Sequence, residues 1–303
     1  MQRSRRFIPV TISMLALAKT LLFTGSVLLI GAGVFVRFTG PDLWRTSSPA
    51  LRRRFLIGIA LGAVLLFVAS GLDIAYTIRN TLGFLDQSMA TLYVSDTRHG
   101  RAVSLRVILI GATAGAAFVG SRHPNSTVRH LTNVGFAVFA TVLLGTFSWI
   151  SHAATMNGTV PMIADLVHFS AAVSWAGSVI YLASLPVWTE NTAPLQTTLL
   201  RLSSLGLITV ATLFGTGIYA GFLHIQDPDL LMGSPYGRTL IIKVLLVISI
   251  VMIATLNRFW LLPALQRHDA LHRLGLFLRL ESVLLFGVLV ATGILSTTAV
   301  PHS

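Results

Sequence analysis

Long apolar segments recur along this chain and leave it few folds to choose from. A membrane-spanning helix needs about 20 predominantly apolar residues, and eight stretches meet that requirement. They lie near residues 12–36, 55–77, 102–121, 132–152, 162–188, 200–222, 239–262 and 276–296. The connections are short, so we predict an all-α polytopic membrane protein in which residues 1–303 form one bundle of eight transmembrane helices. Met89 and Leu92, which lie among polar residues, predict a short interfacial helix between the second and third spans.

The composition indicates a chain surrounded by lipid rather than water. Hydrophobic residues make up 54% of the chain and charged residues 11%, whereas soluble domains carry about 25% charged residues. The formal net charge is +12, but most basic residues lie between the apolar segments, where they suit lipid headgroups better than nucleic acid. The chain has no cysteine, which excludes disulfides, thiolate metal sites and iron–sulfur clusters.

The orientation in the membrane follows from loop charges only weakly. An even number of spans places both termini on the same side. Lys and Arg are slightly more frequent in the segments that are cytoplasmic when the termini lie outside, which favours that orientation. Arg3, Arg5 and Arg6 oppose it.

Ionisable side chains inside apolar segments are costly and usually face a cavity, a partner or a ligand. Followed up and down the eight spans, they separate into two groups. The side that carries the termini collects possible metal ligands: Asp73, His152, Asp165, His168, His224 and His302, with Met156 and Met162 at similar depth. The other side collects Asn257, Arg258, Arg267, His268, His272, Arg273, Arg279 and Glu281. In this second group we expect Glu281 to form an ion pair with Arg258 or Arg279.

Local spacing strengthens the first group. Met162, Asp165 and His168 recur every third residue, which places them on one face of a helix. A short connection brings the fourth and fifth spans together, so His152 can approach His168. Imidazole with carboxylate suits Cu(II), and imidazole with thioether suits Cu(I). Simpler interpretations stay open: Asp165 also suits a helix cap, and the Met residues also suit packing.

Other sequence patterns exclude some function classes. The chain has no G-x-x-x-x-G-K-[ST] segment and no H-E-x-x-H pair, which argues against a P-loop ATPase and a metalloprotease of that type. We predict no catalytic residues and expect the protein not to be an enzyme. A b-type cytochrome is the alternative function, because two facing His residues are what a bis-imidazole haem requires.

A series of short motifs completes the evidence from the residues. They are Ser148–Ala154, Asp165–His168, Trp175–Gly177, Tyr236–Arg238, Lys243, Asn257–Phe259, Leu262–Pro263, Glu281 and Pro301–His302, with Thr97–Gly100 and Arg106 in the first half. In this order the chain resembles the bacterial copper resistance protein D family. His152 matches the family's Gly-His-Ala element, with Ser151 in place of Gly, and Asp165 and His168 match its Asp-x-x-His element.

The resemblance implies a copper-handling protein of the bacterial inner membrane that acts in copper uptake or tolerance. It also implies a periplasmic copper-binding partner and an N-terminus on the periplasmic side. We therefore expect copper to be captured on that side by residues drawn from His152, His168, Asp165, His224, His302, Met156 and Met162. The remaining intramembrane polar residues are expected to be structural or gating: Asp73, Lys243, Asn257, Arg258 and Glu281.

Overall fold

The structure is a computed structural model of the 303-residue chain. It describes residues 8–83, 87–122, 126–151, 159–185, 192–224, 233–265 and 268–298, except for the side chains of residues 8–13, 82, 224 and 268. Every regular element in these ranges is helical. In order they are α1 (Ile8–Val34), η1 (Phe35–Thr39), α2 (Pro41–Arg45), α3 (Pro49–Leu82), α4 (Gln87–Asp96), α5 (Arg98–Arg122), α6 (Ser126–Ser148), α7 (Val160–Ala183), α8 (Ala193–His224), α10 (Pro235–Leu256), η3 (Asn257–Leu261) and α11 (His268–Leu295). The segments η1 and η3 are π-helical turns.

The prediction of eight membrane-spanning helices is confirmed. The helices long and apolar enough to cross a bilayer are Met14–Thr39, Pro49–Thr81, Arg98–Arg122, Ser126–Ser148, Val160–Ala183, Ala193–Leu223, Pro235–Leu261 and Asp269–Leu295. Several begin earlier than predicted, because polar residues continue a helix beyond its apolar part. Two end four or more residues earlier. The fourth stops at Ser148, and the fifth stops at Ala183, shortly before Pro186, since a proline disfavours helical backbone in the residue before it.

Capping residues account for where several helices begin and end. Ser48 accepts a hydrogen bond from the backbone N–H of Leu51 at the start of α3, and Pro49 occupies the first helical position. The same helix ends at Gly83, whose φ of 81° is in the left-handed region that favours glycine. At α10, Ser234 accepts from the N–H of Gly237 in the same way.

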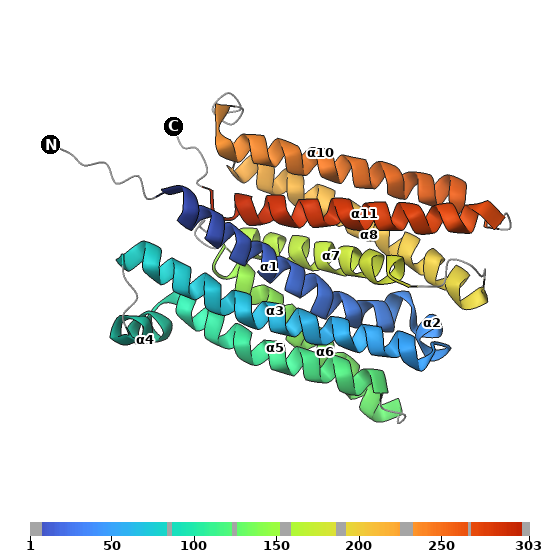
Figure 1. Cartoon of the computed structure of the whole chain (residues 1–303), viewed down its shortest axis with the longest axis horizontal. Coiled ribbons are helices and arrows are strands. Elements are labelled where there is room, and N and C mark those ends of the chain that lie inside the picture. Colours follow the sequence, from blue (N-terminus) through green and yellow to red (C-terminus); the bar gives the residue numbers. More distant parts are fainter. Residues whose placement is uncertain are drawn as a thin grey trace.

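The helices form a layered bundle in which α1 is central (Figure 1). It packs against α3 and α5 on one side and against α7 and α11 on the other, while α10 packs on α11 and α8 on α7. Small residues allow the closest approaches: a Cβ on Gly31 of α1 would collide with the backbone of Gly177 of α7. The spans of α8 and α10 are the most exposed, and α1 is the most buried.

Helix α1 begins and helix α11 ends at the same end of the bundle, here called the terminal end (Figure 1). The predicted interfacial helix is present there as α4, a ten-residue helix with no buried residue that lies across the direction of the spans. The residues sorted to the terminal side by sequence, Asp73, Asp165 and His168, all lie in the halves of their helices nearest this end. The structure therefore places these three residues and α4 at the same end.

Candidate functional site

His168 lies two turns into α7 and is held by a hydrogen bond across to α8. Its Nδ1 is 2.8 Å from the hydroxyl of Thr216. That hydroxyl donates its one proton to the carbonyl of Thr212, at 2.6 Å, so it accepts from the imidazole and Nδ1 carries the ring hydrogen. Nε2 then keeps its lone pair. A histidine whose other nitrogen donates to a protein oxygen has the arrangement of a metal-binding histidine.

The same side of α7 carries two further possible metal ligands. Met162 and Asp165 are half-buried, as is His168, and the spacing of three residues places all of them on one side of the helix. Lys243 of α10 is close enough to interact electrostatically with both Asp165 and His168. The carboxylate therefore has a cationic partner when no metal is bound. Asp165 is not a helix cap, because α7 begins at Val160, with Pro161 in its first turn.

The other predicted metal ligands cannot be placed against this pair. His152, Met156 and His302 lie outside the described residues, as does the side chain of His224. Within the described residues, no three His, Asp or Glu side chains come together as a group that could hold a metal ion. Of the predicted metal ligands, the structure thus describes Asp165 and His168, with Met162 on the same side of α7.

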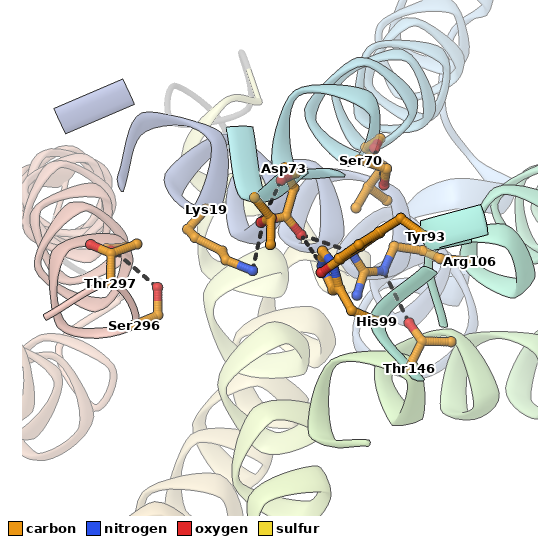
Figure 2. Close-up of polar contacts among 12 residues, drawn as sticks. Lys19, Ser70, Asp73, Tyr93, His99, Arg106, Thr146, Ser296 and Thr297 are labelled. Atoms are coloured by element: carbon orange, nitrogen blue, oxygen red, sulfur yellow. Dashed lines mark hydrogen bonds and ion pairs between the residues drawn. The ribbon is translucent and has the colours of Figure 1, made fainter. Parts of the chain in front are cut away.

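A second cluster at the terminal end surrounds Asp73, which is fully buried on α3 (Figure 2). Its Oδ1 is 2.8 Å from the Lys19 ammonium of α1. Its Oδ2 is 3.2 Å from Nε2 of His99 and 3.8 Å from Nη1 of Arg106, both on α5. One carboxylate thus joins α1, α3 and α5 through two permanent cations and an imidazole.

Arg106 is fully buried, as Asp73 is. Its Nε donates to the hydroxyl of Thr146 at 3.1 Å, and its guanidinium lies 3.9 Å from the ring centre of Phe147. Nη1 and Nη2 are buried and have no hydrogen-bond partner among the described residues. The cluster therefore contains more positive than negative charge.

His99 differs from His168 because both of its ring nitrogens are engaged. Nε2 donates to the carboxylate of Asp73, which can only accept, and Nδ1 lies 3.2 Å from the phenol of Tyr93 on α4. Burial raises the pKa of the Tyr93 phenol, so this hydroxyl keeps its proton and donates it to Nδ1. His99 consequently links the interfacial helix to the bundle and has no lone pair free for a metal.

The ion pair predicted for Glu281 is wrong. Glu281 of α11 accepts a hydrogen bond from the amide of Asn257, with 2.5 Å between Oε1 and Nδ2. Arg258 donates instead to the hydroxyl of Ser203 on α8. Arg279 is exposed, because two residues along a helix place it on nearly the opposite side from Glu281.

Comparison with known proteins identifies the family. A family model described as Copper resistance protein D-like, N-terminal domain, matches residues 10–162, about half of the chain. The chain belongs to the copper resistance protein D family. A second model, Copper resistance protein D, matches residues 196–295. A relative named Copper resistance protein D, from Pseudomonas syringae pv. tomato, is 28% identical over 265 residues, which cover 83% of each chain. No solved structure matches.

The two matched ranges cover different polar groups of the protein. The N-terminal range of the copper resistance protein D family contains the whole Asp73 cluster, and the second range contains Lys243, Asn257 and Glu281. Asp165 and His168 lie between the two ranges. The protein is therefore a multi-pass membrane protein of a copper resistance family, and its candidate ligand pair lies where the N-terminal match ends and α7 continues.

Proposed function

We propose that this protein binds copper at the terminal end of the bundle and delivers it into or across the membrane. The observation that carries the proposal is the hydrogen bond from His168 to Thr216. It directs the ring hydrogen to Nδ1 and keeps Nε2 as a donor within a membrane span, where an uncommitted imidazole is costly unless it serves a ligand. Membership of a copper resistance family indicates which metal this donor serves.

Asp165 and Met162 are the proposed companions of His168. A carboxylate oxygen suits Cu(II), and a thioether suits Cu(I), so this face of α7 offers a donor for either oxidation state. The remaining ligands are proposed to come from His152, His224, His302 and Met156. Because Lys243 neutralises Asp165 in the absence of metal, an arriving copper ion has to compete with an ammonium group for the carboxylate. That competition favours reversible over permanent binding.

The biological setting is proposed from the family. We place the protein in the bacterial inner membrane with both termini on the periplasmic side, where a periplasmic copper-binding protein supplies the ion for uptake or tolerance. The protein binds and moves copper without catalysing a reaction. In this orientation α4 and both polar clusters of the terminal end face the periplasm.

Elemental analysis tests the site directly. The detergent-purified protein is loaded with copper under oxidising or reducing conditions, washed, and analysed for copper and iron per chain. We expect one copper and negligible iron in the wild type, and loss of that copper in His168→Ala. His130→Ala is the matched control, because His130 is exposed at the start of α6, at the opposite end.

Two outcomes contradict the proposal. Unchanged copper stoichiometry and affinity in His168→Ala would move the site elsewhere in the protein. Stoichiometric iron accompanied by a haem absorbance band would instead assign the protein to the electron carriers.

A further inference from the structure

The middle of the bundle contains a buried carboxyl group whose role the copper site does not explain. Glu281 lies midway along α11 and is 2% exposed. Its hydrogen bond comes from the amide of Asn257, which is 8% exposed and lies where α10 passes into η3. Both side chains are thus inside the membrane-spanning region and away from the terminal end.

The charged and titratable groups on the surrounding elements are engaged elsewhere or exposed. The elements packed against α11 are α1, α7, α10 and the π turn η3. The contacts of their charged and titratable groups, together with that of Arg37 in the adjoining η1, are Lys19 with Asp73, Arg37 with the carbonyl of Ala116, Asp165 with Lys243 electrostatically, His168 with Thr216, Tyr181 with the carbonyl of Leu28, and Arg258 with Ser203. Tyr236 and Arg238 lie at the distant start of α10, and Asp269, His272, Arg273 and Arg279 of α11 itself are exposed. Among the described residues, no cation pairs with Glu281.

An ionised carboxylate without a counter-charge is strongly disfavoured in a medium of low dielectric constant. Such a group takes up a proton, or it binds a cation. Asn257 suits an exchange between the two states. Its amide donates to the carboxylate and, turned over, accepts from the O–H of the carboxylic acid. Its Oδ1 is buried and has no hydrogen-bond partner among the described residues, so an acceptor is already present beside the acid.

The backbone at Asn257 is also unusual. The π-helical turn η3 begins at this residue, and the carbonyl of Asn257 accepts from the N–H of Leu262 at 2.9 Å. Isolated π turns within α-helices occur frequently at functional sites. Here the turn directs Asn257 to α11 and the next residue, Arg258, to α8. The π turn therefore lies at the residue that donates the hydrogen bond to Glu281.

We propose that Glu281 binds and releases a proton within the membrane, that Asn257 is its positioning residue, and that this exchange is coupled to copper movement. In the release step the carboxyl O–H bond breaks, the proton passes to water at one end of the bundle, and the carboxylate remains. In the uptake step a proton from water restores the acid. The carboxylate attracts a cation entering the bundle and the acid does not, so protonation sets when copper can pass. The coupling rests on the proposed function, whereas the protonation does not.

Infrared difference spectroscopy tests the protonation without copper. The full chain is reconstituted in lipid and titrated with acid and base, and the carbonyl stretch of protonated carboxyl groups is followed. We expect a band at neutral pH that is lost in Glu281→Gln and shifted in Asn257→Leu. Asp269→Asn, which removes an exposed carboxylate from the same helix, is expected to leave the band unchanged. Absence of the band in the wild type at neutral pH, or its persistence in Glu281→Gln, overturns the proposal.

Copper flux into vesicles tests the coupling. Vesicles containing the protein and a pH-sensitive dye are given copper with the pH gradient in either direction. The wild type is expected to respond to the gradient and to move protons with copper, and Glu281→Gln is expected to lose both responses while it binds copper in the same stoichiometry. An identical gradient response in both proteins contradicts the coupling. If copper binding fails even in the wild type while the infrared band behaves as expected, the proposed function is wrong and the proton site stands.

Discussion

The hydrogen bond from His168 to Thr216 makes a sharp prediction about copper affinity. In Thr216→Val the side chain keeps its shape but loses the oxygen that accepts from Nδ1. Removing such a partner of a metal ligand typically costs 10–100-fold in metal affinity, which equals about 1.4–2.7 kcal/mol. The loss arises because the imidazole is free to rotate and to place its hydrogen on Nε2. We expect the dissociation constant for copper to rise by this factor while the stoichiometry is retained.

A competition titration against a chromophoric copper chelator measures this change in the purified protein. Thr212→Val is the control, because Thr212 lies one turn away on the same helix and its hydroxyl bonds only to the carbonyl of Ile208. Its substitution is expected to change the dissociation constant less than about twofold, because it leaves the hydrogen bond between His168 and Thr216 in place. Equal affinities in the two variants would refute the reasoning, since His168 would then bind copper without help from Thr216, or would not bind it.

Two predictions concern stability. Lys19→Met leaves Asp73 buried without its nearest cation and should cost about 3–5 kcal/mol of folding free energy. The double variant with Asp73→Asn should recover part of that loss in a thermal unfolding assay, and a single variant as stable as the wild type would contradict the ion pair. Gly31→Leu should lower the melting temperature by separating α1 from α7, because its side chain meets the backbone of Gly177. Gly111→Leu, where a Cβ meets nothing within 4 Å, should leave the melting temperature nearly unchanged.

Hydropathy alone was sufficient to predict the eight spans, since each apolar segment had to be a helix in lipid. It could not give their ends. Pro49 and Arg98 begin helices that extend into polar sequence. There the apolar content does not indicate where the helix begins, and capping residues determine the boundary. The interfacial helix α4 was predictable for a different reason, because its apolar side chains are interspersed with polar ones.

The sequence was sufficient to predict on which side of the bundle Asp73, Asp165 and His168 lie. It was not sufficient to predict which residues they contact. Counting along the spans correctly places Asp73 near the terminal end, yet the choice of Lys19, His99 and Arg106 as its partners depends on which helices are neighbours. A signal was available: Lys19 and Asp73 are opposite charges within apolar segments at the same end. The ion pair expected for Glu281 is replaced by a hydrogen bond from Asn257, because Arg258 is directed to Ser203 on α8 and Arg279 lies on the other side of α11.

Charge is distributed unevenly between the two parts of the bundle, and this bears on where copper moves. In the part built from α1, α3, α5 and α6, the charge of Asp73 is compensated by Lys19 and Arg106, and His99 is engaged at both ring nitrogens. A cation entering beside Lys19 and Arg106 would also be repelled. In the part built from α7, α8, α10 and α11, His168 keeps a lone pair and Glu281 has no cationic partner among the described residues.

Donor groups and unbalanced negative charge are what a passing cation requires, and they occur together only in the second part of the described bundle. A route for copper is accordingly expected along α7 and α11, from His168 near the terminal end to Glu281 midway along α11. The Asp73 cluster is expected to hold the helices of the first part in place. Substitutions that abolish copper flux without unfolding the protein should therefore concentrate on α7, α10 and α11, whereas those around Asp73 should reduce flux only as far as they reduce stability. A flux-defective but fully stable Asp73→Asn variant would reverse this assignment.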